Sequence, residues 1–118
     1  MKKMKVKKYF FGSIEIEDKV YHHDVLVLPT GIEKWWRKEG HNVYLEDLEK
    51  IWKFNPEIII FGQGTPGLMK VSEEVKKILT DKNIEFHILP TSSAIKLWNE
   101  YIEKYPDKII IGAFHLTC

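Results

Sequence analysis

The stretch Phe54–Lys70, FNPEIIIFGQGTPGLMK, decides the fold of this chain. Its apolar run Ile58–Phe61 has no polar alternation, which is typical of a strand covered on both faces inside an α/β sheet. The run leads directly into the glycine-rich loop Gly62–Gly67, where glycines can adopt positive φ and bring the backbone close to another group. We therefore expect a central strand here and a functional site in the loop that follows it.

Length and charge indicate one globular domain without a dominant basic surface. A chain of 118 residues with 44% hydrophobic residues is long enough to bury a substantial core. Lys and Arg number 18 and Asp and Glu 17, a balance that argues against a dedicated nucleic-acid binder. The exception is Met1–Lys8, with five lysines, which could be a flexible arm, the start of the first strand, or a weak phosphate-contacting arm.

The cysteine count and hydropathy predict a cytoplasmic location. The single cysteine, Cys118, excludes an internal disulfide and fits a reducing compartment. No stretch approaches the about 18 apolar residues of a membrane span. The amino end has positive charge but lacks the apolar segment of a secretory signal. The abundance of Lys, Glu and Ile would suit a thermophilic source.

The residues before the central strand predict a hairpin and a helix. Tyr9–Glu17 alternates apolar and polar residues, and Val20–Leu28 alternates before it becomes continuously apolar, so the two are expected to pair antiparallel. Ile32–Asn42 is expected to be irregular or a short strand. Leu45–Phe54 places its apolar residues at helical spacing, which predicts a helix.

The residues after the glycine loop alternate helix and strand. Ser72 is expected to cap a helix, and Thr91, Ser92 or Ser93 to cap another that runs to about Tyr105. The remaining strands are predicted at Ile84–Leu89 and Lys108–Phe114. The β-α-β-α-β half should form parallel strands through right-handed crossovers. The predicted fold is a single three-layer α/β domain at residues 9–118, with a central mixed β-sheet, an amino-terminal β-hairpin and helices packed on the sheet; residues 1–8 form the basic arm.

The glycine loop matches the dinucleotide-binding pattern only in its letters. In that pattern the helix begins within the glycines, whereas here Pro66 and residues 68–71 precede the Ser72 cap. The pattern also needs an acidic residue at the end of the next strand, where this chain has Leu89-Pro90. No Gly-Lys-Ser/Thr follows, so it is not a Walker loop. We predict no cofactor, and favour a backbone-lined turn or the rim of a small-ligand site.

Loops after parallel strands gather at the carboxyl edge of a sheet, where ligands usually sit. That rule places the glycine loop beside the segment after Leu89. Free amides at a helix start, together with hydroxyl groups, could hold a small anion or carboxylate, although plain helix capping is the alternative. The expected ligand-binding residues are Gly62, Gly64, Gly67, Thr91 and Ser92.

The stretch Trp35–His41, WWRKEGH, is a candidate partner surface. Adjacent residues of a strand face opposite sides, so one tryptophan should pack on the body of the protein. The other, Trp36, would then lie with Arg37 on the surface and offer the residue types that dominate interfaces; packing of both tryptophans in the core is the alternative. The expected partner surface comprises Trp36, Arg37 and His41.

The sequence contains no convincing catalytic set. The five histidines lack partners at ligand spacing, so we predict no metal site. Cys118 and His115 could form a nucleophile pair, but a terminal residue is poorly positioned for catalysis. Asp24 could be a buried, hydrogen-bonded carboxylate or a surface residue. These three residues are weak catalytic candidates.

Several short pieces occur in the same order in one known family: Phe11–Ile16 (FGSIEI), Tyr21 with Asp24, Trp36–His41 (WRKEGH), Pro56-Glu57, Gly62–Val71, Leu89–Thr91, Asn99, and His115–Cys118 (HLTC). The chain resembles the small Mth-type domain family, a domain of unknown function. Relatives in that family include the animal adipogenesis-associated Mth-domain protein and a mitochondrial complex I assembly factor. The resemblance covers Phe11 to Cys118 and implies a compact three-layer α/β fold with a central mixed sheet. It implies no reaction.

Three functions follow as hypotheses. The first is a non-catalytic domain that binds a partner protein or a small anionic ligand at the carboxyl edge of its sheet. The second is an enzyme that acts on a small anionic substrate with a residue of the carboxyl-terminal HLTC segment. The third is a nucleic-acid accessory factor that uses the lysine-rich arm. A membrane partner is not expected, and a homodimer is an open alternative.

Overall fold

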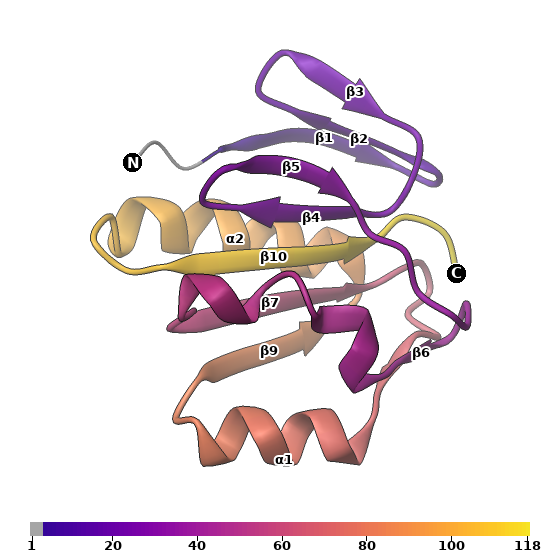
Figure 1. The fold of residues 1–118 in the computed structure, drawn as a ribbon. Coiled ribbons are helices and arrows are strands. Elements are labelled where there is room, and N and C mark those ends of the chain that lie inside the picture. The colour runs from indigo at the N-terminus through magenta and orange to yellow at the C-terminus, as the bar shows by residue number, and fades with distance from the viewer. Residues whose placement is uncertain (1–3) are drawn as a thin grey trace.

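The computed structural model describes residues 4–118 and is built on a five-stranded sheet (Figure 1). The strand order is β5-β4-β10-β7-β9, with β10 in the middle. β10 runs parallel to β7, which is parallel to β9, whereas β4 is antiparallel to both β10 and β5. The predicted central mixed sheet is therefore confirmed. The strands span Val25–Leu28 (β4), Gly31–Lys34 (β5), Ile58–Gln63 (β7), Glu85–Leu89 (β9) and Ile110–His115 (β10).

Two helices make the crossovers between the parallel strands. α1 (Glu73–Asp81) connects β7 to β9, and its predicted cap is confirmed because the Ser72 hydroxyl accepts a hydrogen bond from the Val75 amide at 3.3 Å. α2 (Thr91–Lys104) connects β9 to β10 and starts directly after Pro90. Within the described residues no side chain caps α2, so the predicted hydroxyl cap is wrong. The Thr91 hydroxyl instead bonds to the Gly64 amide and the His115 carbonyl.

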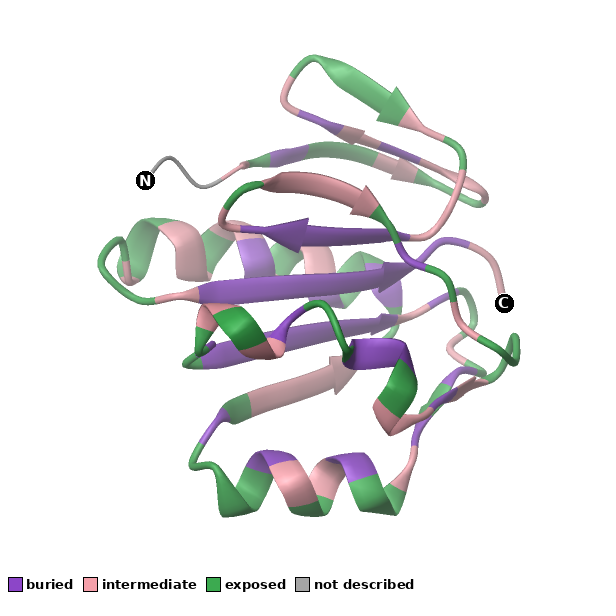
Figure 2. Ribbon diagram, in the orientation of Figure 1, coloured by how far each residue is buried: buried purple, intermediate pink, exposed green. Residues whose placement is uncertain are grey.

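Three layers result, because both faces of the central sheet are covered. On one face lie α2 and a three-stranded antiparallel sheet; on the other lie α1 and two turns of 3-10 helix (Figure 1). Figure 2 shows the buried strands β4, β10 and β7 running through the middle of the molecule. On the first face the rings of Trp98 and Phe114 meet edge to face, with their centroids 5.9 Å apart.

The amino-terminal strands differ from the prediction in two places. The chain turns at Gly12, which has a φ of +86°, so the expected strand Tyr9–Glu17 is instead β1 (Val6–Phe10) paired with β2 (Ser13–Ile16). The expected strand Val20–Leu28 divides into β3 (Lys19–Tyr21) and β4, which belong to different sheets. Physically, the continuously apolar half is buried on both faces, whereas the alternating half belongs to the outer sheet.

The lysine-rich start of the chain contributes to this outer sheet. Lys7 and Lys8 lie on β1 and are exposed, whereas residues 1–3 lie outside the described part. The free edge of β1 is tied to α2 by one side chain. The Asn99 amide group accepts from the Val6 N–H at 2.9 Å and donates to the Val6 carbonyl oxygen at 2.8 Å.

The prediction of one continuous helix at Leu45–Phe54 is wrong. It forms two 3-10 turns, η1 (Leu45–Leu48) and η2 (Trp52–Phe54), and ends at Asn55 in the left-handed conformation. Asp47 accepts from the Tyr44 amide at 2.8 Å and from the Lys38 amide at 3.2 Å, so local side-chain bonds hold this tight turn.

A short parallel pair completes the fold. β6 (Asn42–Val43) and β8 (Lys70–Val71) link the segment after β5 to the end of the glycine loop. No helix among residues 4–118 has both the length and the apolar character needed to cross a membrane.

Candidate functional site

The last residues of the chain fill the carboxyl edge of the central sheet. Beyond β10, the segment Leu116–Cys118 passes between the β1–β2 turn and the glycine loop (Figure 1). The Leu116 carbonyl accepts from the Gly12 amide, and the Thr117 carbonyl accepts from the Thr65 amide, both at 2.8 Å. The space that a ligand was expected to share with the glycine loop is thus occupied by the protein's own tail.

The glycines are needed for this internal contact. Gly64 has a φ of +85°, and a Cβ there would lie 1.9 Å from the Thr117 carbonyl oxygen. A Cβ at Gly62 would lie 2.8 Å from the Thr91 hydroxyl oxygen, and one at Gly67 would lie 3.3 Å from Pro90 Cγ. The close backbone approach predicted for this loop is made to the rest of the chain.

Thr91 connects the loop to β10. Its buried hydroxyl donates to the His115 carbonyl at 2.5 Å and accepts from the Gly64 amide at 2.8 Å. Its own amide donates to the Gly64 carbonyl at 3.1 Å. Ser92 is exposed on α2. Of the five expected ligand-binding residues, the structure therefore brings together four and leaves Ser92 on the surface; a role in ligand binding stays a prediction.

Asp24 lies at the centre of a polar cluster, which we call the Asp24 clasp: Asp24, Arg37 and His115. One carboxylate oxygen accepts from the Leu116 amide at 2.8 Å. The other accepts from Arg37 Nη2 and from His115 Nδ1, both at 2.7 Å. Desolvation raises the pKa of Asp24, but the hydrogen bonds from His115, Arg37 and Leu116 together outweigh it and hold the pKa below its ordinary value. Asp24 is therefore a partly buried, hydrogen-bonded carboxylate.

Arg37 is buried in this cluster, so the expectation that its side chain lies on the surface is wrong. Its side chain is 4% exposed. Nη1 donates to the carbonyls of Glu39 and Gly40, at 2.9 and 2.8 Å, and the guanidinium lies 5.0 Å from the centre of the Trp35 ring. The guanidinium thus holds the loop after β5 through hydrogen bonds to its carbonyl groups, and it also pairs with Asp24.

The two adjacent tryptophans face opposite sides. Trp35 is buried and donates its indole N–H to the Asp47 carbonyl at 2.9 Å. Trp36 is 69% exposed. His41 is exposed, and its carbonyl accepts from the Lys70 amide at 2.8 Å. Two of the three residues expected to form a partner surface therefore lie on the surface, and their role there stays a prediction.

One nitrogen of the His115 ring faces two partners in the Asp24 clasp. His115 Nδ1 lies 2.7 Å from Asp24 Oδ2, which can accept a hydrogen bond, and 2.8 Å from Arg37 Nη2, which can only donate one. His115 Nε2 and Arg37 Nε are both buried, and neither has a hydrogen-bond partner among residues 4–118. An ionised carboxylate that orients a histidine is the arrangement that prepares the other ring nitrogen to accept or donate a proton.

The structure joins two of the three weak catalytic candidates. Asp24 and His115 touch, but no hydrogen bond within residues 4–118 links the free, half-buried Cys118 thiol to either of them. The sequence reasoning did not connect Arg37 to the pair. The antiparallel pairing of β4 with β10 places Asp24 beside His115, the last residue of β10, and no local sequence pattern indicates that pairing. The described residues contain no group of three His, Cys, Asp or Glu side chains placed to hold a metal.

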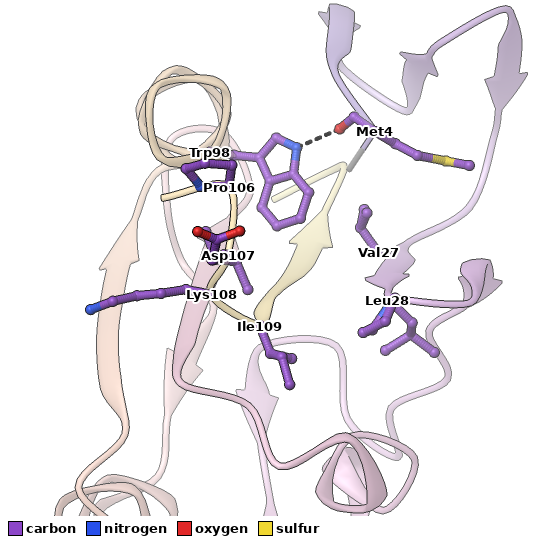
Figure 3. A pocket seen from close by; sticks show the side chains of 10 residues that line it. Met4, Val27, Leu28, Trp98, Pro106, Asp107, Lys108 and Ile109 are labelled. Carbon is purple, nitrogen blue, oxygen red and sulfur yellow. Dashed lines mark hydrogen bonds between the residues drawn. The ribbon is translucent and has the colours of Figure 1, made fainter. Parts of the chain in front are cut away.

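A separate cavity of about 240 Å³ lies at the opposite end of β10. Its walls include Val27, Leu28, Trp98 and Ile109, and the Trp98 indole N–H donates to the Met4 carbonyl at 2.7 Å (Figure 3). The Lys108 side chain points away from the cavity (Figure 3). This cavity has polar as well as apolar walls and shares no residue with the Asp24 clasp or the glycine loop.

The fold has counterparts in known proteins. The family described as "Protein of unknown function (DUF498/DUF598)" matches residues 6–115. The conserved hypothetical protein PH1505 from Pyrococcus horikoshii OT3 is 29% identical, with a TM-score of 0.82 over 98% of this chain and 100% of that one. A structure named MT938 is 25% identical, with a TM-score of 0.76 over 98% and 99% of the two chains.

A more distant structure has the same fold. A Bordetella pertussis protein described as an Mth938-like domain is 17% identical, with a TM-score of 0.71 over 96% of this chain and 85% of that one. The resemblance drawn from the short sequence pieces is confirmed by the family match and by these structures. This chain belongs to the DUF498/DUF598 family of Mth-type domains, a family of unknown function.

Proposed function

We propose that this chain is a non-catalytic binding domain that docks a partner protein at the carboxyl edge of its central sheet. The observation that supports the proposal is the distribution of exposed apolar side chains. Five large apolar residues are exposed among residues 4–118, and four of them belong to segments that bond to the tail or to the Asp24 clasp. We call these four the apolar rim: Phe10, Phe11, Trp36 and Leu68.

Hydrogen bonds tie two of the three segments of the apolar rim to the tail and the third to the Asp24 clasp. Phe10 and Phe11 lie at the β1–β2 turn, where the Gly12 amide donates to the Leu116 carbonyl. Leu68 directly follows the glycine loop, whose Thr65 amide donates to the Thr117 carbonyl. Trp36 precedes Arg37, which donates to Asp24. The rim residues thus belong to segments that the tail and the Asp24 clasp hold together.

The residue types of the rim suit a protein interface. Tryptophan is among the residue types enriched at the few interface positions that carry most of the binding energy in protein complexes. Monomeric proteins rarely expose large contiguous apolar patches without a function. Asp24 and Thr91, polar residues of the same edge, make hydrogen bonds to other residues of the chain. Such an edge presents exposed apolar side chains, and the partner that it fits is a different protein with an apolar surface of its own.

The experiment places a photo-reactive amino acid at one position at a time in the full chain. Positions 11, 36 and 68 test the rim, and position 20 is the matched control because Val20 is the fifth exposed apolar residue and lies on β3, outside the rim. Each variant is expressed in the source cells and irradiated there. We expect the rim positions to form a covalent adduct with one and the same protein and position 20 to form none.

Two results would overturn the proposal. One is an equal adduct from position 20, because binding would then not depend on the rim. The other is an adduct only with a second copy of this chain, because the edge would then be a homodimer interface.

A further inference from the structure

The central strand β10 is paired with its neighbour β4 over only part of its length. The paired residues are Gly112–Phe114 of β10 and Val25–Val27 of β4, although β10 begins two residues earlier, at Ile110. In this antiparallel register the partner of Ile110 would be Pro29, which has no backbone N–H. Among residues 4–118 no hydrogen bond joins the N–H or C=O of Ile110 to Pro29 or to any other group on the β4 side. The ladder therefore ends before it reaches the start of β10.

Both backbone groups of Ile110 point toward this unpaired side. Alternate residues of a strand direct their N–H and C=O groups to opposite neighbours. The Ile109 carbonyl accepts from the Ile58 amide of β7 at 3.2 Å, so the N–H and C=O of Ile110 face away from β7. Ile110 is only 3% exposed. Buried backbone groups nearly always have a hydrogen-bond partner, so two unpaired groups on one buried residue call for a specific explanation.

These two groups border the cavity of about 240 Å³ at this end of β10. Val27, Pro29 and Ile110 all line it, so the cavity lies at the gap that the interrupted ladder leaves. Figure 3 shows the Trp98 ring on one side of the cavity and Val27 on the other. A cavity of about 150 Å³ is enough to hold benzene, so this one has room for a single substituted aromatic ring.

We propose that this cavity binds one small neutral ring that carries a hydrogen-bond acceptor and a donor on adjacent atoms, the edge found in lactams and pyrimidine bases. The acceptor receives the Ile110 N–H, and the donor bonds to the Ile110 carbonyl, so the ring replaces the missing partner residue in the ladder. The site goes beyond partner docking, because none of the four rim residues lines it.

The geometry of the strand selects this edge of the ligand. A residue in a hydrogen-bonded antiparallel pair donates through its N–H and accepts through its C=O, both with the same partner. A ring with acceptors alone would leave the Ile110 carbonyl unpaired, and an apolar ring would leave both groups unpaired, which weakens binding. The Trp98 indole N–H already donates to the Met4 carbonyl, so Trp98 contributes its ring face or edge to an aromatic contact.

The walls favour a neutral ring over an anion such as a nucleotide. Lys108 is the only Lys or Arg among the described residues that line the cavity, and its side chain points away from it (Figure 3). Asp107 also lines the cavity, and its negative charge repels a phosphate group. A phosphate or carboxylate would therefore enter without a cation to pair with it.

The test is a nitrogen-15 NMR titration of the full chain with 2-pyridone and, separately, with N-methyl-2-pyridone. Both rings have the carbonyl acceptor, but only 2-pyridone has the adjacent N–H donor. With 2-pyridone we expect the Ile110 amide proton to move downfield and saturate, and the Trp98 indole N–H signal to shift with the same midpoint. N-methyl-2-pyridone should bind at least about tenfold more weakly, because it leaves the Ile110 carbonyl unpaired.

A larger side chain in the cavity wall should block the site. Ile109 lines the cavity and is only half-buried, so Ile109→Trp adds bulk there without crowding the core. Glu100→Trp introduces the same side chain at an exposed position of α2 and is the matched control. We expect Ile109→Trp to abolish the saturable response to 2-pyridone and Glu100→Trp to keep it.

The wild-type titration decides the proposal even if Ile109→Trp disturbs the fold. Equal affinity for the two pyridones would show that the cavity does not recognise the donor–acceptor edge. A response to 2-pyridone that never saturates would show that the cavity holds only water. Either result would overturn the proposal and leave partner docking at the apolar rim intact, because the rim lies at the opposite end of β10 and rests on other residues.

Discussion

Asp24 is the residue on which the carboxyl edge depends most. Its carboxylate accepts hydrogen bonds from three groups that are distant in sequence: Arg37, His115 and the Leu116 amide. Its side chain is only 17% exposed, so these bonds form in a partly desolvated setting. Charge-assisted bonds of this kind are stronger than neutral ones. One side chain thus fixes the start of β4, the loop after β5 and the tail in a single arrangement.

The lowered pKa of Asp24 predicts a pH-dependent contribution to stability. Because the pKa is lower in the folded state than the ordinary value of 3.8, the contribution is fully present above that value and is lost as the pH falls through the folded-state pKa. We expect Asp24→Asn to lower the free energy of unfolding by about 3 kcal/mol at pH 7, the cost of breaking a buried ion pair. Urea unfolding of both proteins at pH 7 and near pH 2.5 measures this, and the difference should shrink at the lower pH. An undiminished difference at the lower pH would contradict the ionised role of Asp24.

Gly64 predicts a steric effect that can be separated from backbone strain. Gly64→Ala would place a Cβ against the Thr117 carbonyl, whereas Gly12→Ala, at almost the same φ, would meet nothing within 4 Å. The control Gly12→Ala should lower the free energy of unfolding by about 1 to 2 kcal/mol because of the left-handed conformation alone. Gly64→Ala should lower the free energy of unfolding, measured by chemical denaturation, by clearly more. Deletion of residues 117–118 should narrow the difference between the two substitutions and leave only the cost of the contact with His115 Cδ2; an undiminished difference would mean that the tail does not fill the loop.

At the scale of the elements, the outer sheet depends on the bond between β1 and α2. Asn99 pairs with both backbone groups of Val6, which would otherwise be a free strand edge. Asn99→Leu leaves two backbone groups unpaired, so we expect a loss of about 2 kcal/mol. Amide hydrogen exchange should show β1 opening before the central strands. The exposed neighbour Glu100→Gln is the control, and equal protection of β1 in both variants would rule out this clamp.

Elements defined by local chemistry were predictable from the sequence. The apolar run Ile58–Phe61, the Ser72 cap and the strand near Ile84–Leu89 are found where their patterns indicate. The segment at Leu45–Phe54 is different, because helical spacing does not distinguish an α-helix from 3-10 turns held by Asp47. The division of Val20–Leu28 between two sheets depends on burial in the whole fold, which no local pattern contains.

The candidate site was predictable as a set of residues and not as an arrangement. Asp24 and His115 stand out individually, but their contact spans 91 residues of sequence and depends on the register of β4 against β10. Arg37 resembled a surface residue because its charge suggests exposure, although a buried carboxylate pairs with it. The glycine loop suggested an open crevice because the tail that fills it carries no strand or helix pattern.

At the scale of the whole molecule, the carboxyl edge combines a rigid polar interior with an apolar rim. The tail, the glycine loop and the Asp24 clasp hold the edge, while Phe10, Phe11, Trp36 and Leu68 face outward. The central sheet and its two covering layers bring these distant segments together (Figure 2). We propose that a partner protein binds at this rim.

The most direct measurement is isothermal titration calorimetry with the partner protein that the photo-crosslinking experiment identifies. That partner is titrated separately with the wild-type chain, the Trp36→Ala variant and the Val20→Ala variant. Trp36 contributes little to the folded core, so its removal should leave the unfolding midpoint unchanged. As an interface anchor, its loss should cost at least about 2 kcal/mol of binding, roughly a thirtyfold weaker Kd. Val20→Ala should bind like wild type. Unchanged affinity of Trp36→Ala, or an equal loss in Val20→Ala, would contradict the claim.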